Sequence, residues 1–266
     1  MNKRIELLGY PVDNLSTPEI IHQVRQAIES SHKIHIIAIN ANKFYQGRKD
    51  QLLSQILKQA EIVIPEYAFV WASRMIRRPL VEHIGGIMLM RKLMEVGQSC
   101  GFSFFFLGAK SEVLELMITN IKQQHGAQIV AGWHHGYFTD EDRLIHSINQ
   151  SSANILLVAM GVPGQEYFIH RNKHRIRVPI MMGVGGSFDV FAGLRRETPS
   201  YLRHGFEWFY RLLQDPRNLW KRYLMSNPYF VYQVLKQKWN HHSRAKYPVS
   251  QDQSGADQIP CQPADQ

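Results

Sequence analysis

Ile155-Leu-Leu-Val-Ala-Met-Gly-Val-Pro-Gly-Gln-Glu166 is the most informative part of the sequence, because an unbroken apolar run enters a loop with two glycines and a proline. A strand that is apolar along its whole length is buried on both faces, which is typical of a parallel sheet. Comparable apolar runs occur at residues 34–39, 62–64, 102–107, 128–131 and 180–182, separated by amphipathic helical stretches. This alternation predicts an α/β fold in which helices cover a parallel sheet.

The chain changes character at about residue 195. Residues 195–246 lack strand-like runs, are rich in aromatic residues, and carry eleven Lys and Arg against three acids, a net +8. We expect three helical pieces there, separated by Pro199, Pro216 and Pro228. Their rings and cations fit the headgroup region of an anionic membrane, although an ordinary helical subdomain with an aromatic core fits the same pattern. We therefore divide the chain into a core at 1–194, a basic aromatic appendage at 195–246, and a polar tail at 247–266 that is predicted to be disordered.

Composition narrows the compartment and the partners. The chain has 266 residues, a formal net charge of +9, and two cysteines, Cys100 and Cys261, that match no metal or redox spacing. It contains no apolar run of about 18 residues, and its first ten residues lack the apolar segment of a signal peptide. We expect a cytoplasmic protein with a negatively charged partner: nucleic acid, anionic lipid or a phosphorylated ligand.

Ligands of parallel α/β sheets bind beyond the carboxyl ends of the strands, so the residues that follow each apolar run are the candidate site. Polar, acidic and glycine residues occupy these positions: Asn40, Asn42, Glu66, Gly108, Gly161, Gln165, Gly185, Gly186 and Asp189. Because the strands are expected to run in parallel, these residues should gather along one edge.

Glu66 is the candidate catalytic residue, because it follows an apolar run and a proline directly. A carboxylate at that edge can act as a general base on a hydroxyl group. The alternatives are that Glu66 caps a helix or pairs with Arg74 or Arg77.

Other patterns are weaker. The turn at residues 108–111 suits a phosphate at a helix N-terminus, but capping alone explains it equally well. Residues 183–188 begin like a dinucleotide-binding loop, yet the third glycine of that motif is absent. Two acidic or histidine patterns could bind a metal, but each is better explained by a helix dipole or a solvated basic face. These two patterns are Asp140-Glu141-Asp142 and the i, i+4, i+8 series Glu166, His170 and His174. We therefore expect neither a metal nor another cofactor.

Three segments together resemble the WecG/TagA/CpsF family of bacterial glycosyltransferases, glycosyltransferase family 26. They are residues 158–166 (VAMGVPGQE), 183–193 (GVGGSFDVFAG) and 207–217 (EWFYRLLQDPR). The resemblance extends from about residue 9 to residue 223. It implies a Rossmann-like core and an inverting, metal-independent transfer of N-acetylmannosamine, or its uronic acid, from UDP to a polyprenyl-diphosphate-linked acceptor. It also implies a C-terminal appendage on the inner face of the plasma membrane.

The resemblance assigns roles to individual residues. Glu66 stands where the family usually has a catalytic Asp, Asn42 matches the family's Asn, and Gln165 matches a family glutamine expected near the sugar or diphosphate. Asn40 stands where a related enzyme has Thr. Three arginines resemble the appendage arginines that would face a diphosphate: Arg211, Arg217 and Arg222.

The sequence also departs from the family pattern, and other functions stay open. His83 and Met88 replace residues of a segment in which the family commonly shows Arg and a Gly-x-Asp-Leu run. A member that has lost catalysis is one alternative. A binder of single-stranded nucleic acid is another, although no nucleic-acid motif is present and we expect no such partner. The sequence does not decide whether the chain forms a homo-oligomer.

Overall fold

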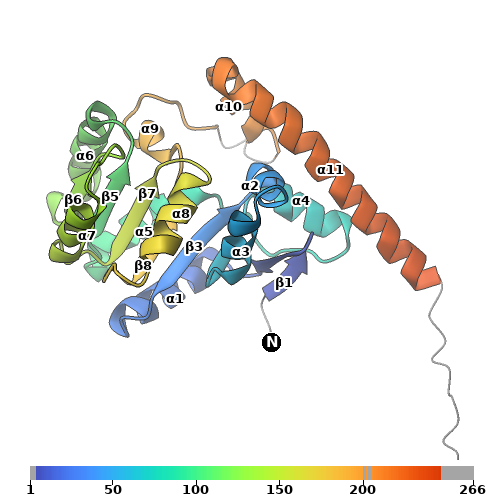
Figure 1. Cartoon of the computed structure of the whole chain (residues 1–266), viewed down its shortest axis with the longest axis horizontal. Helices are drawn as coiled ribbons and strands as arrows, with labels where there is room; N and C mark the ends of the chain where they lie inside the picture. The colour runs from blue at the N-terminus through green and yellow to red at the C-terminus, as the bar shows by residue number, and fades with distance from the viewer. Residues whose placement is uncertain (1–3, 200–201, 203–204, 247–266) are drawn as a thin grey trace, which may run out of the picture.

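A computed structural model describes residues 4–199, 202 and 205–246. Its centre is a six-stranded sheet in which every pair of neighbouring strands is parallel, with the order β4-β3-β8-β7-β5-β6 (Figure 1). The strands are β3 (Ile34–Ile39), β4 (Ile62–Pro65), β5 (Phe104–Gly108), β6 (Val130–His134), β7 (Ile155–Ala159) and β8 (Ile180–Gly183). The predicted α/β class with a Rossmann-like parallel sheet is confirmed.

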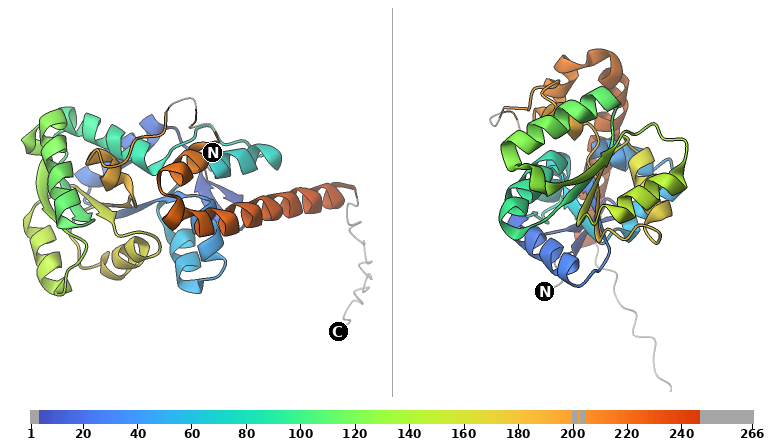
Figure 2. Two further views of the ribbon diagram at one scale, coloured as in Figure 1. Left: turned by 90° about the horizontal axis from the view of Figure 1, so that it is seen from above. Right: turned by 90° about the vertical axis from the view of Figure 1, so that its left-hand side faces the viewer.

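Helices cover both faces of the sheet, as expected, because the strands are apolar on both sides (Figure 2). One face packs a single hydrophobic cluster against α1 (Thr17–Glu29), α5 (Gly86–Cys100), α6 (Ser111–His125) and α9 (Ser187–Phe191). The other face carries two clusters. One involves α2 (Ala41–Gly47), α3 (Gln51–Gln59) and α4 (Tyr67–Met75), and the second involves α7 (Glu141–Gln150) and α8 (Gly164–Asn172).

The fold contains an N-terminal hairpin that the sequence pattern did not reveal. Strands β1 (Arg4–Leu7) and β2 (Tyr10–Asp13) pair antiparallel as a separate two-stranded sheet. Asp13 joins this hairpin to the main sheet, because its Oδ2 accepts from the backbone N–H of Val63 at 2.6 Å and also pairs with Arg4 at 2.7 Å.

Within the described residues, the C-terminal region contains a short helix, α10 (Glu207–Gln214), and a long one, α11 (Pro216–Lys246). Pro216 occupies the first position of α11, where a missing N–H costs little. The expected break at Pro228 is wrong, since α11 continues through this proline. Packing provides the physical reason: Phe230 and Val234, just beyond the proline, are buried in the cluster formed by α2, α3 and α4.

Two further details concern β6 and the segment before α10. The strand expected at residues 128–131 begins later, as β6, because residues 127–129 form a short 3-10 helix. The segment that leads to α10 is tied to its surroundings by ion pairs from Arg91 to Glu197 and from Arg195 to Asp215. The predicted tail at 247–266 lies outside the described residues.

Candidate functional site

A cavity of about 460 Å³ lies between the carboxyl ends of β3 and β4 and the two C-terminal helices. Residues from both regions line it. On the sheet side they include Asn40, Asn42, Glu66, Tyr67 and Trp71, and on the helical side Glu207, Trp208, Arg211, Arg222, Tyr223 and Asn227. Its size and mixed apolar and polar lining are typical of a small-molecule site.

Glu66 faces this cavity from the position just before α4. The amide Nδ2 of Asn40 donates to Glu66 Oε2 at 3.1 Å, while Asn40 Oδ1 accepts from the backbone N–H of Lys43 at 2.9 Å. Neither alternative role of Glu66 occurs within the described residues, because its side chain makes no helix-capping bond and no ion pair with Arg74 or Arg77. The carboxylate is thus oriented by a neutral amide.

Two guanidinium groups approach the cavity from the C-terminal helices. Arg211 pairs with Glu207 one turn earlier on α10. Desolvation lowers the pKa of Arg211, but the nearby carboxylates of Glu207 and Glu66 raise it by more. The net pKa is raised, so Arg211 stays positively charged. Arg222 on α11 has a buried Nε that finds no partner among the described residues. A buried donor without an acceptor is costly, and an anionic ligand would satisfy it.

Arg217 behaves differently from the other two appendage arginines. It is exposed and does not line this cavity. The structure therefore brings Arg211 and Arg222 to the cavity that Glu66 faces and leaves Arg217 exposed in the first turn of α11.

A second, smaller cavity of about 60 Å³ adjoins the first, because Glu207 and Arg211 line both. Gly85, Met88 and Gly186 belong to its other walls. The two cavities together follow the carboxyl edge of the sheet from β4 through β3 toward β8.

The remaining predicted residues lie at the carboxyl ends of neighbouring strands but line neither cavity. They are Gly108, Gly161, Gln165, Gly185 and Asp189. Gly108 has a φ of +132°, and a Cβ there would lie 2.3 Å from the carbonyl oxygen of Ala159, so only glycine fits. Gln165 is buried and accepts from the backbone N–H of Gly185 at 2.9 Å.

The sequence matches a known family over most of its length. The family model described as "Glycosyl transferase WecG/TagA/CpsF family" matches residues 5–244. The chain belongs to this family. The resemblance found in the motifs is confirmed, and so is the prediction that the protein is a glycosyltransferase.

Two relatives show how far the similarity extends. The chain is 30% identical over 227 residues to an enzyme of Bacillus spizizenii strain W23, covering 85% of this chain and 88% of the relative. It is 30% identical over 242 residues to an enzyme of Staphylococcus aureus strain MW2, covering 88% of this chain and 93% of the relative. Both relatives are named N-acetylglucosaminyldiphosphoundecaprenol N-acetyl-beta-D-mannosaminyltransferase.

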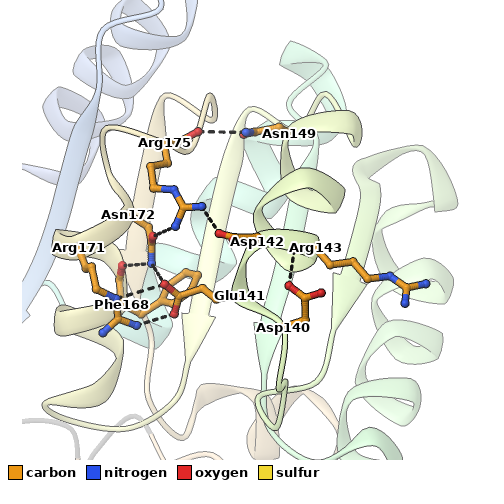
Figure 3. A network of polar contacts seen from close by, with 9 residues as sticks. All are labelled: Asp140, Glu141, Asp142, Arg143, Asn149, Phe168, Arg171, Asn172 and Arg175. Carbon is orange, nitrogen blue, oxygen red and sulfur yellow. Dashed lines mark hydrogen bonds and ion pairs between the residues drawn. The ribbon is translucent and has the colours of Figure 1, made fainter.

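The acidic run at residues 140–142 of this glycosyltransferase joins two helices (Figure 3). Asp140 caps α7 by accepting from the backbone N–H of Arg143, Glu141 pairs with Arg171, and Asp142 pairs with Arg175. These arginines also lower the pKa of Glu141, chiefly through the hydrogen bond from Arg171. Glu141 and Asp142 therefore hold α7 against the end of α8 and the residues that follow it, while Asp140 caps α7.

The histidine series is also dispersed. Glu166 is buried and pairs with Lys43, whereas His170 and His174 line a hollow beside the start of β3. No group of three or more His, Cys, Asp or Glu suited to a metal ion occurs within residues 4–199, 202 and 205–246.

Sequence reasoning missed several residues that line the larger cavity. Tyr67, Trp71 and Asn227 gave no signal, because nothing local indicates that their helices meet. Glu207 could have been found, since it stands four residues before Arg211, the spacing at which helical side chains pair. In the part of the chain that the structure describes, no helix has the length and apolar character needed to cross a bilayer.

Proposed function

We propose that this glycosyltransferase moves an N-acetylmannosaminyl group, or a related sugar or uronic acid, from UDP to a polyprenyl-diphosphate-linked sugar during cell-surface polysaccharide synthesis. The observation that carries the proposal is one cavity that holds both a carboxylate oriented by Asn40 and the guanidinium groups of Arg211 and Arg222. Such a site combines a base for a hydroxyl with cations for a diphosphate. The names of the two relatives support the choice of sugar and acceptor.

Glu66 is the proposed general base. Its carboxylate takes the proton of the acceptor hydroxyl while that oxygen attacks the anomeric carbon. The new C–O bond forms as the bond from the anomeric carbon to the UDP oxygen breaks, so a single displacement inverts the anomeric configuration. The electron pair of the broken bond leaves on UDP.

Arginines are proposed to stabilise the diphosphates without a metal ion. A guanidinium can donate two parallel hydrogen bonds to phosphate oxygens, which suits both a leaving UDP and a lipid diphosphate. Arg211 and Arg222 are placed for contact inside the cavity, and exposed Arg217 is assigned to the acceptor diphosphate near the membrane. The glycine loops at Gly108, Gly161, Gly185 and Gly186, together with Asn42, Gln165 and Asp189, are proposed to serve the donor.

Membrane contact is proposed for the outer face of α11. Among the exposed large apolar residues of this helix, five recur at spacings of four or seven, which places them on one face. These residues are Trp220, Leu224, Val231, Leu235 and Trp239. The helix extends beyond the core (Figure 2), so this stripe, defined by these five residues, can lie on the cytoplasmic leaflet while the cavity stays beside it.

The test compares wild type with Glu66→Gln, which keeps the size of the side chain and removes its basicity. UDP release is measured across a panel of UDP-sugars with a lipid-diphosphate-linked sugar acceptor. We expect Glu66→Gln to lower turnover by roughly two to four powers of ten, with UDP affinity changed less than about threefold. Glu115→Gln, an exposed glutamate on α6, is the matched control and should behave as wild type.

Other outcomes separate the alternatives. Equal turnover in Glu66→Gln and wild type would remove Glu66 from the role of base. UDP binding without turnover on any donor and acceptor would indicate a member that has lost catalysis. Binding of an oligonucleotide that weakens with salt, without any thermal shift from UDP-sugars, would instead favour a nucleic-acid binder.

A further inference from the structure

A buried ion pair lies behind the proposed site. Lys43 Nζ on α2 is 2.8 Å from Glu166 Oε1 on α8, and the side chains are 4% and 0% exposed. Moving both charges out of water has a large desolvation cost, and apolar replacement of such pairs is often neutral or stabilising. Stabilisation of the fold is therefore a weak explanation for the presence of this ion pair.

Each member of the pair is linked to a loop at the carboxyl edge of the sheet. On one side, the backbone N–H of Lys43 donates to Asn40, whose amide donates to Glu66. On the other side, Gln165 Nε2 donates to Glu166 Oε1 at 2.9 Å, and Gln165 Oε1 accepts from Gly185. A continuous series of polar contacts thus connects the Glu66 carboxylate with the loop that follows β8.

The packing around Gln165 and Glu166 is consistent with this series of polar contacts. A Cβ on Gly183 would lie 2.4 Å from Gln165 Nε2 and 2.8 Å from its Cδ, so the absence of a side chain at 183 leaves the space that Gln165 occupies. The second oxygen of Glu166 is buried and has no hydrogen-bond partner among the described residues. Glu166 is consequently held from one side only, through Lys43 and Gln165.

We propose that Lys43 and Glu166 are positioning residues that fix the loops of the site relative to one another. Lys43 anchors the start of α2, and with it the Asn40 amide that aims Glu66. Glu166 anchors Gln165, and with it the turn at Gly185. The inference rests on the proposed function of Glu66 as a base, because a fixed carboxylate matters most to the step in which it takes a proton.

The main test is the double variant Lys43→Met/Glu166→Met, which removes both charges and keeps side chains of similar length. We expect it to fold with a melting temperature within a few degrees of wild type. Its kcat should fall about 10- to 100-fold, as expected for a displaced reacting group, which is a larger factor than any rise in KM for the UDP-sugar. A folded double variant with wild-type kcat would overturn the proposal.

Two further variants serve as controls for the double variant. Lys173→Met breaks a second lysine–glutamate pair, Lys173 with Glu61, whose side chains are 28% and 31% exposed and which lies at the opposite end of α8. This variant should leave kcat unchanged. If it lowers kcat as strongly as the double variant, the effect is general and the proposal fails. Gly183→Ala displaces Gln165 without changing any charge, and should reproduce the loss of kcat even if the double variant does not fold.

Amide hydrogen exchange separates this inference from the proposed function. In the double variant the backbone N–H of Gly185 should exchange at least about tenfold faster, while the amides of β7 keep their protection. Unchanged exchange at Gly185 would overturn the positioning role, whatever the activity. Absence of turnover in wild type, with Gly185 exchange accelerated in the variant, would reject the proposed function and retain the structural coupling.

Discussion

Replacing Leu224 and Leu235 with serine in the chain should weaken binding to anionic vesicles about 45-fold. The two side chains are 65% and 50% exposed and belong to the stripe on α11. Full burial of a leucine contributes about 2 kcal/mol, so the exposed fractions correspond to about 1.3 and 1.0 kcal/mol. Their sum of about 2.3 kcal/mol is equivalent to roughly a 45-fold change in the partition constant.

The assay is co-sedimentation of the purified chain with vesicles that contain an anionic phospholipid. The matched control is Leu52→Ser/Leu116→Ser, two leucines 45% and 42% exposed on α3 and α6. Because these helices lie on the core, the control pair should bind vesicles as wild type does. Wild-type binding by the α11 variant, or an equal loss in the control, would refute the membrane assignment.

Two further predictions concern stability. Phe230→Ala should cost about 3–5 kcal/mol in a urea titration, because Phe230 is buried with its ring 5.4 Å from that of Phe44; a loss below about 1 kcal/mol would show that α11 does not depend on this contact. Burial, with repulsion from Lys43 and other cations, lowers the pKa of His35 to about 3. The unfolded chain therefore binds the proton first, and stability should fall as the pH drops from about 6.5 to 3, by up to about 1.4 kcal/mol per pH unit. His35→Gln should flatten this slope in urea titrations at several pH values, and an unchanged slope would contradict the assignment.

Elements that are buried on both faces could be predicted from the sequence, since continuous apolar runs such as Ile155–Ala159 admit few alternatives. Elements at the margin could not. Strand β6 lies at the edge of the sheet and carries Trp133 and His134, so its apolar signal is interrupted. The hairpin β1–β2 has four residues in each strand, too few for a period to stand out. Pro228 suggested the end of a helix because proline usually breaks a helix, and the neighbouring residues give no sign that Phe230 packs against the core.

Part of the candidate site could likewise be predicted from the sequence, and part could not. The position of Glu66 at the edge of the sheet could be predicted, because it depends only on where the strand before it ends. Its contact with Asn40 joins the ends of neighbouring parallel strands, so it too was within reach. The pairing of Lys43 with Glu166 was not, because more than a hundred residues separate them and only the packing of α2 and α8 brings them together.

The cluster that packs α11 against the core contains Leu7 and Tyr10 from the first hairpin as well as Phe230 and Val234. Leu8 reinforces this link, since its backbone N–H donates to Gln237. A ribosome that adds about 5–20 residues per second needs roughly 10 to 45 s to make the chain between these two ends. During that interval the part of the hairpin that α11 covers stays exposed, so a nascent chain released before about residue 230 would keep this apolar surface uncovered.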